Sequence, residues 1–307
     1  MSDLRERPSA PSGLTSIVIV TADSGMGVGE SIERVLRSAA PVEIIVVDND
    51  SRDGSVERLA ARFARDPLVR ILRNDSNLGF GAACNRGAAV ARGDALLLLN
   101  PDCLIEDDTI ARLRTVLGSD AGIGLVGVLQ AGLDGGIDPA SRRRDPLLRR
   151  ALMSAFGIAR FASRWPMFAG VEMAANESDP AVEPVDAVSG ALMLMPRPVF
   201  DRLGGFDEGY FLHCEDLDLC RRVRDAGWRV VCANDVRVVH ARGGSSRHRQ
   251  VFVAWHKHRG MWRWFSKFDP AARNPVLRIL VWCGIWTAFA VRLPLLLWRW
   301  RGVTRAP

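Results

Sequence analysis

The sequence has no paired cysteines and no apolar leader. Its cysteines form neither a C-x-x-C pair nor a ladder of short spacings; they are Cys84, Cys103, Cys214, Cys220, Cys232 and Cys283. We therefore expect reduced, mostly buried thiols in a cytosolic protein. The first 13 residues, MSDLRERPSAPSG, are polar and carry acids, so we expect that they are not a signal peptide.

Acidic residues are almost missing from the C-terminal part of the chain. Residues 241–307 hold 13 Lys and Arg and a single acid, Asp269, whereas the first 240 residues hold 28 basic and 34 acidic side chains. The C-terminal part also contains seven of the nine tryptophans. We expect an acidic-to-neutral body, long enough to bury a sizeable core, followed by a basic, Trp-rich segment.

Strand and helix signals alternate over the first 130 residues. Short β-branched or leucine-rich runs predict strands at residues 16–21, 43–48, 69–72, 95–99 and 123–129. Helical patterns between them predict helices near residues 32–36, 56–63, 79–91 and 107–117. This alternation predicts βαβ units, a parallel sheet and an α/β fold.

Periodicity is lost between residues 130 and 185. Glycine, aspartate, proline and an arginine cluster (residues 142–144, 149 and 150) dominate there. We expect a mobile insertion of mixed helix and loop, whose arginines form a solvated or lipid-facing surface. Order returns afterwards, with strands expected at residues 191–195, 229–232 and 236–240, and helices at 198–203, 215–226, 246–268 and 276–300.

One predicted strand ends in residues suited to chemistry. The four leucines of Leu96-Leu97-Leu98-Leu99-Asn100-Pro101-Asp102 predict a strand buried on both faces. Ligands bind at this end of the strands in open α/β sheets, where Asp102 could hold a divalent cation against a diphosphate. The alternative is a surface loop in which Asp102 caps the following helix.

Four further residues occupy comparable positions. Asp48 ends the second strand, where it could bind a nucleobase or ribose or simply begin a turn. Glu215 and Asp216 are paired carboxylates at a helix start, suited to deprotonating an acceptor hydroxyl or to stabilising the helix dipole. His240 ends a strand and could complete a metal shell or be structural. In this order, the candidates match the needs of a site for a nucleotide-diphosphate sugar.

Five segments together resemble family 2 glycosyltransferases, and within them the bacterial rhamnosyltransferase-like branch. They are VVDNDSRDGS (46–55), NDSNLGFGAACNRGAAVARGD (74–94), LLLLNPD (96–102), VSGALMLMPRPVFDRLGGFDEGYFLHCEDLDLCRRVRDAGWRV (188–230) and VRVVHARGGSS (236–246). The resemblance covers about residues 15–246. It implies a GT-A fold, a mixed and mainly parallel sheet built on a Rossmann-like half, and an inverting enzyme that uses Mg²⁺ or Mn²⁺.

The resemblance also implies roles for individual residues. The family's Asp-x-Asp metal motif corresponds to residues 100–102, which leaves Asp102 as the main metal ligand, with His240 as the second. The catalytic base falls within Glu215-Asp216, and Asp216 is favoured. Where Ala22 stands, the family usually has an aromatic residue. The expected donor-binding residues are Thr21, Asp23, Asp48, Asn77, Gly79, Asn85, Asn100 and Gly190.

The same resemblance favours a donor, whereas the C-terminal segment suggests the lipid-linked acceptor and the sequence pattern suggests the domain organisation. The expected donor is dTDP-L-rhamnose, ahead of UDP-hexoses, and the expected acceptor is a glycan or polyprenyl-diphosphate-linked glycan in cell-surface polysaccharide synthesis. We expect a flexible N-terminus (1–14), a catalytic domain (15–246) and a helical C-terminal segment (247–307). The catalytic domain divides into a nucleotide-binding half (15–129), the insertion (130–185) and an acceptor and catalytic half (186–246).

The C-terminal segment contains an apolar run, residues 279–298, that is nearly long enough to span a bilayer. Arg292 and Pro294 interrupt it, and basic residues flank it on both sides. This pattern favours a helix lying in an anionic membrane surface; a spanning helix, a packed soluble helix and a homodimer contact are the alternatives. We expect peripheral attachment to the inner face of the bacterial cytoplasmic membrane.

Three other functions compete with sugar transfer. Gly25, Gly27 and Gly29, followed by Asp48, loosely fit a nicotinamide-dependent oxidoreductase, but their G-x-G-x-G spacing departs from G-x-G-x-x-G. The basic tail allows a nucleic-acid binder, yet the body is net acidic and has no recognition motif, so we expect no such partner. A sugar-nucleotide-binding protein without catalysis is the third, against which the intact carboxylates argue.

Overall fold

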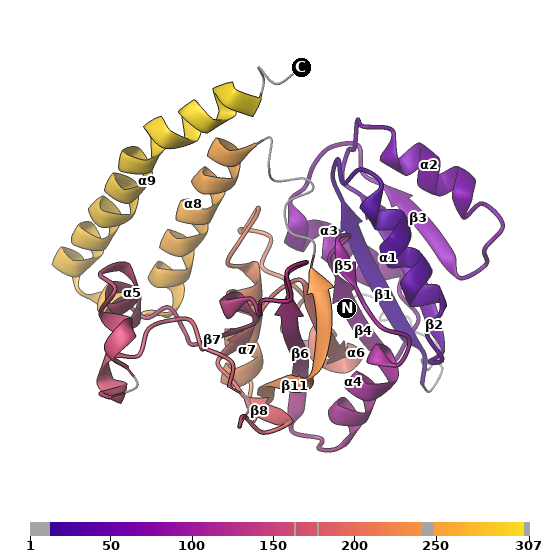
Figure 1. Ribbon diagram of the computed structural model, residues 1–307, viewed down its shortest axis with the longest axis horizontal. Coiled ribbons are helices and arrows are strands. Elements are labelled where there is room, and N and C mark those ends of the chain that lie inside the picture. Colours follow the sequence, from indigo (N-terminus) through magenta and orange to yellow (C-terminus); the bar gives the residue numbers. More distant parts are fainter. Residues whose placement is uncertain (1–12, 163, 177, 241–248, 304–307) are drawn as a thin grey trace, which may run out of the picture.

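A mixed nine-stranded sheet forms the centre of the molecule (Figure 1). The computed structural model describes residues 13–162, 164–176, 178–240 and 249–303, and for 299–303 the backbone only. Three expectations therefore lie partly outside the described residues: the flexible N-terminus, the start of the helix at 246–268 and the end of the motif at 236–246. The strands of this sheet are β1 (Thr15–Thr21), β2 (Val42–Asp48), β3 (Val69–Arg73), β4 (Ala95–Leu99), β5 (Cys103–Leu104), β6 (Ile123–Ala131), β8 (Val182–Pro184), β10 (Leu192–Pro196) and β11 (Arg229–His240).

The sheet is parallel on one side and mixed on the other. Its order is β3-β2-β1-β4-β10-β6-β11-β5, with β8 paired to β11. Strands β3, β2, β1 and β4 are parallel, and so are β6 and β11, whereas β10 runs antiparallel between β4 and β6. This confirms the expected mixed, mainly parallel sheet. The carboxyl ends of β1, β2 and β4 consequently meet at one edge, next to the residues that precede β10.

Alternating side chains divide the core into two layers, one on each face of the sheet. One layer contains Ile17, Ile19, Ile44, Val46, Leu97 and Leu99, and the other contains Val18, Val20, Ile45, Val47, Leu96 and Leu98. The first layer is covered by α1 (Gly27–Leu36), α2 (Ser55–Arg62) and α4 (Thr109–Gly118). The second is covered by α3 (Phe80–Val90), α6 (Arg197–Leu203) and α7 (Glu215–Asp225).

The insertion contains more ordered backbone pairing than the sequence predicts. Strand β7 (Arg142–Arg143) pairs antiparallel with β9 (Ala187–Val188) and forms a second, two-stranded sheet. Helix α5 (Leu148–Ala155) follows, and three short 3₁₀ helices complete the insertion: η1 (Pro139–Ser141), η2 (Ile158–Phe161) and η3 (Pro166–Phe168). The pairing with β9 ties the insertion to the chain just before β10.

Strand β11 is continuous where two strands were expected. Its register against β6 shifts between Ala233 and Arg237, so the intervening residues form an irregularity within one strand. There, the Asn234 side chain accepts a hydrogen bond from Arg142 (3.1 Å) and donates one to the carbonyl of Pro180 (2.9 Å). Asn234, which lies between the two expected strands, therefore binds the insertion.

The C-terminal segment forms a helical hairpin of α8 (Gln250–Phe268), η4 (Pro270–Arg273) and α9 (Pro275–Val303). Trp264 of α8 is buried within the core layer that α7 covers, so α8 packs as part of the body. Helix α9 contacts α8 through Trp286, whose ring lies 4.6 Å from that of Trp255. By length and composition, its Pro275–Trp298 portion could cross a membrane, and almost none of its most apolar stretch is buried. The interfacial, spanning, packed and homodimer alternatives for this helix all stay predictions.

Candidate active site

The expected metal ligands lie side by side although 138 positions separate them. Asp102 follows β4, and the pairing of Cys103 with His240 in β5 and β11 brings it to the end of β11. The Asp102 Oδ1 and His240 Nε2 atoms are 3.1 Å apart, and both side chains are partly exposed. The other ring nitrogen, Nδ1 of His240, is buried and has no hydrogen-bond partner in the described part of the chain.

This pair fits a divalent cation. Carboxylate oxygen and neutral imidazole are donors that Mn²⁺ accepts, and Mg²⁺ takes carboxylate oxygen together with substrate phosphates. Neighbouring ligand atoms of an octahedral ion with bonds of about 2.1 Å lie about 3 Å apart, close to the observed separation. Among the described residues, no group of three or more His, Cys, Asp and Glu could hold an ion. A cation at Asp102 and His240 would thus take its remaining ligands from water and from substrate phosphate oxygens.

The expected base, Asp216, lies in the first turn of α7 and is nearly buried. Its Oδ1 atom accepts a hydrogen bond from the backbone N–H of Leu217 (2.8 Å), and Oδ2 accepts one from Gly190 (3.1 Å). The backbone carbonyl of Ala191, the residue after Gly190, accepts a hydrogen bond from the Asn100 N–H (2.8 Å). Because Asn100 leads to Asp102, one short stretch of chain connects the two parts of the site.

Backbone strain immediately precedes the paired carboxylates. His213 and Cys214 both have positive φ angles, 67° and 70°, a conformation that costs non-glycine residues free energy. Such strain persists only where the surroundings fix it, and it is concentrated at functional sites. It turns the chain so that α7 begins with Glu215 and Asp216 inside the molecule.

A partly buried arginine that was expected in a surface cluster contacts Asp216, the expected base. Arg143 of β7 forms an ion pair with Asp216 Oδ2, and its guanidinium also donates a hydrogen bond to the carbonyl of Val188 (2.8 Å). Burial raises the pKa of Asp216, but the charge and hydrogen bond of Arg143, with the backbone donors, lower that pKa below its usual value. Asp216 is therefore held ionised, as a proton acceptor requires.

Glu215 behaves in the opposite way. Burial and the neighbouring charge of Asp216 raise the pKa of Glu215 to about 8. Its Oε2 atom is buried without a hydrogen-bond partner among the described residues. The two adjacent carboxyl groups thus separate into a neutral one and an ionised one.

The solvated-surface interpretation of the arginine cluster is wrong for Arg142 as well. Its side chain is almost fully buried and contacts Asp179 (2.7 Å), Glu183 and Asn234. Successive side chains of a strand point to opposite faces, so Arg142 joins this network while Arg143 reaches Asp216. The alternation of side-chain direction along residues 142–144 is the sequence signal that could have distinguished Arg142 from Arg143.

The expected nucleobase residue, Asp48, is buried at the end of β2. Its Oδ1 atom accepts a hydrogen bond from the Ser51 N–H (3.1 Å), as in a turn. The next residue, Asn49, was not singled out, yet its side chain is the centre of a buried network. It donates to the Asn77 side chain (2.9 Å) and to the Gly79 carbonyl (3.2 Å). Asp48 and Asn77 therefore belong to one loop cluster at the edge of the sheet.

Gly79 sits where only glycine fits. Its φ is +87°, and a Cβ atom would lie 2.5 Å from the carbonyl oxygen of Phe211. The N–H of Phe80 donates a hydrogen bond to that same carbonyl (2.9 Å). Here the missing side chain permits close contact with the chain that leads to Asp216.

Thr21 is the last residue of β1, and Asp23 lies just after this strand. Thr21 is fully buried, and its hydroxyl has no hydrogen-bond partner within the described ranges. Asp23 accepts hydrogen bonds from the Arg52 N–H (2.7 Å) and from the side chain of Arg249 (3.1 Å), the residue that precedes α8. The C-terminal segment thus returns to the loops at the expected donor edge.

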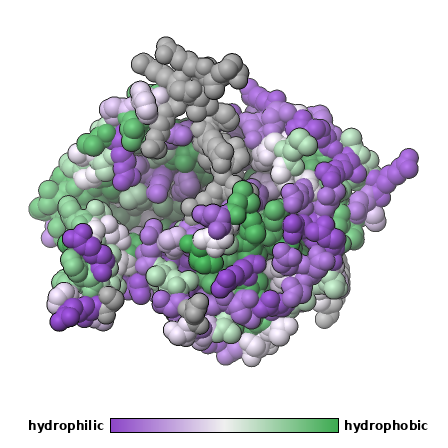
Figure 2. All heavy atoms as spheres, in the orientation of Figure 1, coloured by the Kyte–Doolittle hydropathy of each residue, from purple (hydrophilic) through white to green (hydrophobic). Residues whose placement is uncertain are grey.

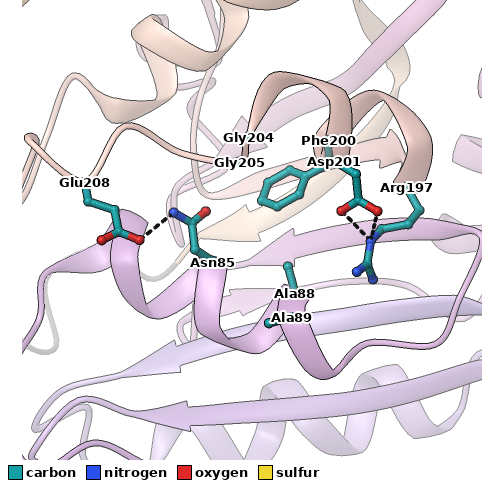
Figure 3. A pocket seen from close by; sticks show the side chains of 9 residues that line it. All are labelled: Asn85, Ala88, Ala89, Arg197, Phe200, Asp201, Gly204, Gly205 and Glu208. Carbon is teal, nitrogen blue, oxygen red and sulfur yellow. Dashed lines mark hydrogen bonds and ion pairs between the residues drawn. The ribbon is translucent and has the colours of Figure 1, made fainter. Parts of the chain in front are cut away.

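Asn85 lies apart from the other donor-binding candidates. Its side chain points from α3 toward the chain after α6, where it bonds both backbone groups of Phe206 and the carboxylate of Glu208 (3.0 Å; Figure 3). These contacts line a cavity of about 270 Å³ that also contains Arg197 and Asp201. Asp102, Asp216 and His240 do not line this cavity.

The mixed sheet with helices on both faces gives the chain a GT-A fold, the fold of a class of glycosyltransferases. Residues 16–174 match Glycosyl transferase family 2. The chain is 30% identical over 263 residues to the N-acetylglucosaminyl-diphospho-decaprenol L-rhamnosyltransferase of Mycobacterium tuberculosis, covering 76% of this chain and 83% of that protein. It therefore belongs to glycosyl transferase family 2, and the oxidoreductase interpretation is wrong.

Other known proteins share parts of the sequence or the fold. Rhamnosyltransferase WbbL of Escherichia coli K12 is 43% identical over 56 residues, 18% of this chain and 21% of that protein. GalNAc-T7, solved with UDP, GalNAc and Mn²⁺, superposes with a TM-score of 0.60 at 19% identity, covering 82% of this chain and 47% of that one. The mannosyltransferase PcManGT of Pyrobaculum calidifontis, solved with GDP-Man and Mn²⁺, superposes with a TM-score of 0.58 at 18% identity. The superposition covers 95% of this chain and 75% of that one.

Proposed function

We propose that this glycosyltransferase moves L-rhamnose from dTDP-L-rhamnose to a hydroxyl of a polyprenyl-diphosphate-linked glycan, in cell-surface polysaccharide synthesis. Similarity over most of both chains to a rhamnosyltransferase acting on a diphospho-decaprenol-linked sugar carries this proposal. The chemistry of the side chains supports it as well: Asp102 and His240 lie side by side, and the hydrogen bonds of Asn100 and Gly190 connect their part of the chain to the ionised Asp216.

We propose an inverting mechanism in which Asp216 is the base. Asp216 takes the proton of the acceptor hydroxyl, and that oxygen forms a bond to the anomeric carbon from the side opposite the leaving group. The bond from the anomeric carbon to the diphosphate oxygen breaks, and its electron pair leaves with the nucleoside diphosphate. Asp102 and His240 would hold Mg²⁺ or Mn²⁺, which would stabilise the negative charge that grows on the diphosphate. Arg143 keeps Asp216 oriented and ionised.

We propose that the remaining donor candidates bind the nucleotide. These candidates lie at the carboxyl ends of strands, on the loops that follow those ends, or just before β10, where nucleotides bind in related architectures: Thr21, Asp23, Asp48, Asn77, Gly79, Asn100 and Gly190. Asn85 stays a proposal that needs its contacts with Phe206 and Glu208 to rearrange.

We further propose that the protein works on the cytoplasmic face of the inner membrane, attached through α9. The exposed apolar surface and basic flanks of α9 support an interfacial position. A homodimer that covers this surface is the competing arrangement.

The test is a donor panel of dTDP-L-rhamnose, UDP-hexoses and GDP-mannose, with Mg²⁺, Mn²⁺ or chelator. Transfer to polyprenyl-diphosphate N-acetylglucosamine and release of nucleoside diphosphate are measured together. We expect transfer from dTDP-L-rhamnose alone, lost with chelator. Preference for another donor would overturn the rhamnose assignment, and no transfer from any donor would favour a non-catalytic binding protein. Asp102→Ala should weaken metal-dependent donor binding; an unchanged metal titration would reject Asp102 as a ligand.

A further inference from the structure

Part of the insertion shares the unusual composition of the C-terminal segment. Residues 146–171 contain four arginines and neither aspartate nor glutamate. Helix α5, which lies within this stretch, has no buried residue. Residues 148–168, hereafter the 148–168 segment, expose large apolar side chains to solvent: Leu152, Phe156, Phe161, Trp165 and Met167. Exposed apolar side chains gathered in this way mark an interaction surface.

The 148–168 segment lies beside the turn of the C-terminal hairpin. Asp269, the acid between α8 and α9, accepts a hydrogen bond from the Leu148 N–H (2.6 Å) and another from the Ala271 N–H (2.8 Å). Figure 1 shows α5 next to the ends of α8 and α9 that meet at this turn. The single acid of residues 241–307 is thus buried in the joint between the two segments.

Together, the two segments carry most of the exposed large apolar side chains of the described chain. On the hairpin these are Phe252, Trp255, Met261, Val276, Leu277, Ile279, Leu280, Trp282, Val291, Leu295, Leu297 and Trp298. Figure 2 shows hydrophobic surface along the edge formed by the hairpin, at the left of the view. The apolar area therefore extends beyond α9.

The arginines of this region contact aromatic rings and carbonyls. The guanidinium of Arg160 lies 4.8 Å from the ring centre of Phe161, and that of Arg164 lies 5.3 Å from the ring centre of Trp165. Arg149 donates a hydrogen bond to the carbonyl of Met167 (2.7 Å). Cations mixed with exposed aromatic and aliphatic side chains are the pattern of segments that lie in an anionic lipid interface.

We propose that the 148–168 segment is a second membrane-binding element that docks, together with α9, on a bilayer containing anionic phospholipid. The inference extends the proposed attachment through α9. Charge favours lipid over a second copy of the chain as the partner of this surface. Two copies would bring basic faces that lack acids together, and these faces repel each other, whereas anionic headgroups attract both α9 and the 148–168 segment. Only four residues separate Arg143, which contacts Asp216, from Leu148. Docking therefore holds the part of the proposed active site around Asp216 close to the membrane surface.

An environment-sensitive fluorophore tests this docking directly. The label is attached at Ala155→Cys in full-length protein that also carries Cys283→Ser, since the other five cysteines are buried. A matched label at Leu133→Cys reports on an exposed apolar position outside both segments. With vesicles of phosphatidylglycerol and phosphatidylcholine, we expect a blue shift and higher emission at 155 and none at 133. High salt or pure phosphatidylcholine should reverse the change.

Other outcomes would overturn the proposal. If vesicles leave the emission of the label at 155 unchanged, as at 133, the 148–168 segment does not contact lipid. A shift that depends on protein concentration without vesicles indicates a second copy on this surface. The double variant Phe156→Glu with Trp165→Glu should weaken vesicle binding by about tenfold or more, whereas Leu133→Glu should not. Transfer to a soluble acceptor is measured in parallel: its loss in a protein that still docks would reject the proposed function and leave this inference standing.

Discussion

At the scale of single residues, the main finding concerns two adjacent carboxyl groups with opposite protonation. Asp216 has an arginine and backbone donors, whereas Glu215 has a buried oxygen without a partner among the described residues. The pKa of Asp216 is lowered and that of Glu215 is raised to about 8. A pair whose environments separate the two pKa values in this way indicates which member acts as the base.

Replacing the base should stop the chemical step without harming donor binding. In Asp216→Asn we expect transfer to fall by about 10²-fold to 10⁴-fold, the usual contribution of a general base. Thermal stabilisation by nucleoside diphosphate should remain nearly as in the natural protein. Single-turnover transfer and thermal shift are the measurements; normal turnover would remove Asp216 from this role.

Replacing Arg143 should change the pH dependence. Without its positive charge, the pKa of Asp216 rises, so the acidic limb of kcat/KM should move to higher pH in Arg143→Leu. Arg143→Lys keeps a cation and should move the limb less. Because the pair is largely buried, Arg143→Leu should also lower the free energy of unfolding by about 3–5 kcal/mol. A lower rate with an unmoved pH profile would mean that Arg143 has only a structural role.

Glu215 should make the protein less stable as pH rises. The folded state keeps the proton of Glu215 up to about pH 8, whereas an unfolded chain releases it near the ordinary glutamate pKa of 4.5. The folded state therefore binds more protons in this window, and the free energy of unfolding falls as pH increases through it. Glu215→Gln should flatten the fall in melting temperature between pH 5 and 8.

The exposed substitution Glu57→Gln provides the control for this measurement, because its carboxylate is largely solvated. We expect its melting curve to follow pH as the natural protein does. Equal slopes for Glu215→Gln and Glu57→Gln would show that Glu215 is ionised in the folded state.

At the scale of elements, α8 belongs with the catalytic body. Gly260 allows α8 to pack on the strained turn before α7, because a Cβ atom there would lie 2.7 Å from the His213 carbonyl oxygen. Lys267 bonds both Asp207 (2.7 Å) and the buried Asp218 (2.6 Å). Helix α8 thus supports the chain that carries Glu215 and Asp216.

Removing the anchor of α8 should destabilise the whole domain. Trp264 is almost fully buried in the core, so Trp264→Ala should lower the free energy of unfolding by about 3–5 kcal/mol. Trp282→Ala, at a half-exposed position of α9, should cost much less. Chemical denaturation checks both variants. Similar losses would contradict the assignment of α8 to the core.

At the scale of the whole molecule, charge and apolar surface are gathered on the same side. The body is net acidic, whereas the C-terminal segment and the 148–168 segment are basic and expose aromatic residues. This asymmetry orients a protein toward a negatively charged surface.

The complete chain should bind vesicles in a manner that depends on salt. Sedimentation with phosphatidylglycerol vesicles should retain the protein at low salt and release part of it near 1 M salt, where the screening length falls to about 3 Å. Neutral vesicles should retain less. A protein that stays in solution at low salt without detergent, and ignores anionic vesicles, would contradict membrane attachment.

Local features of the sequence correctly predicted most of the first half of the fold. The runs at β1, β2, β4 and β6 are short, apolar and bounded by turn residues, so their own composition defines them. Asp102 and the paired carboxylates were found because each stands directly at the end or the start of a predicted element. The strands β5, β7, β8 and β9 were missed, since two or three residues carry no periodicity.

The sequence by itself determined that this is an α/β glycosyltransferase with carboxylates at strand and helix ends, because those signals depend on residues close together in the chain. Only the tertiary structure decided three contacts. Arg143 keeps Asp216 ionised, Asn49 connects the loops near Asp48 by hydrogen bonds, and the insertion lies against Asp269. Each of these contacts joins segments that local patterns do not relate. Their partners are set by how the sheet and helices pack, and an arginine at a surface and one buried against a carboxylate look alike until that packing is known.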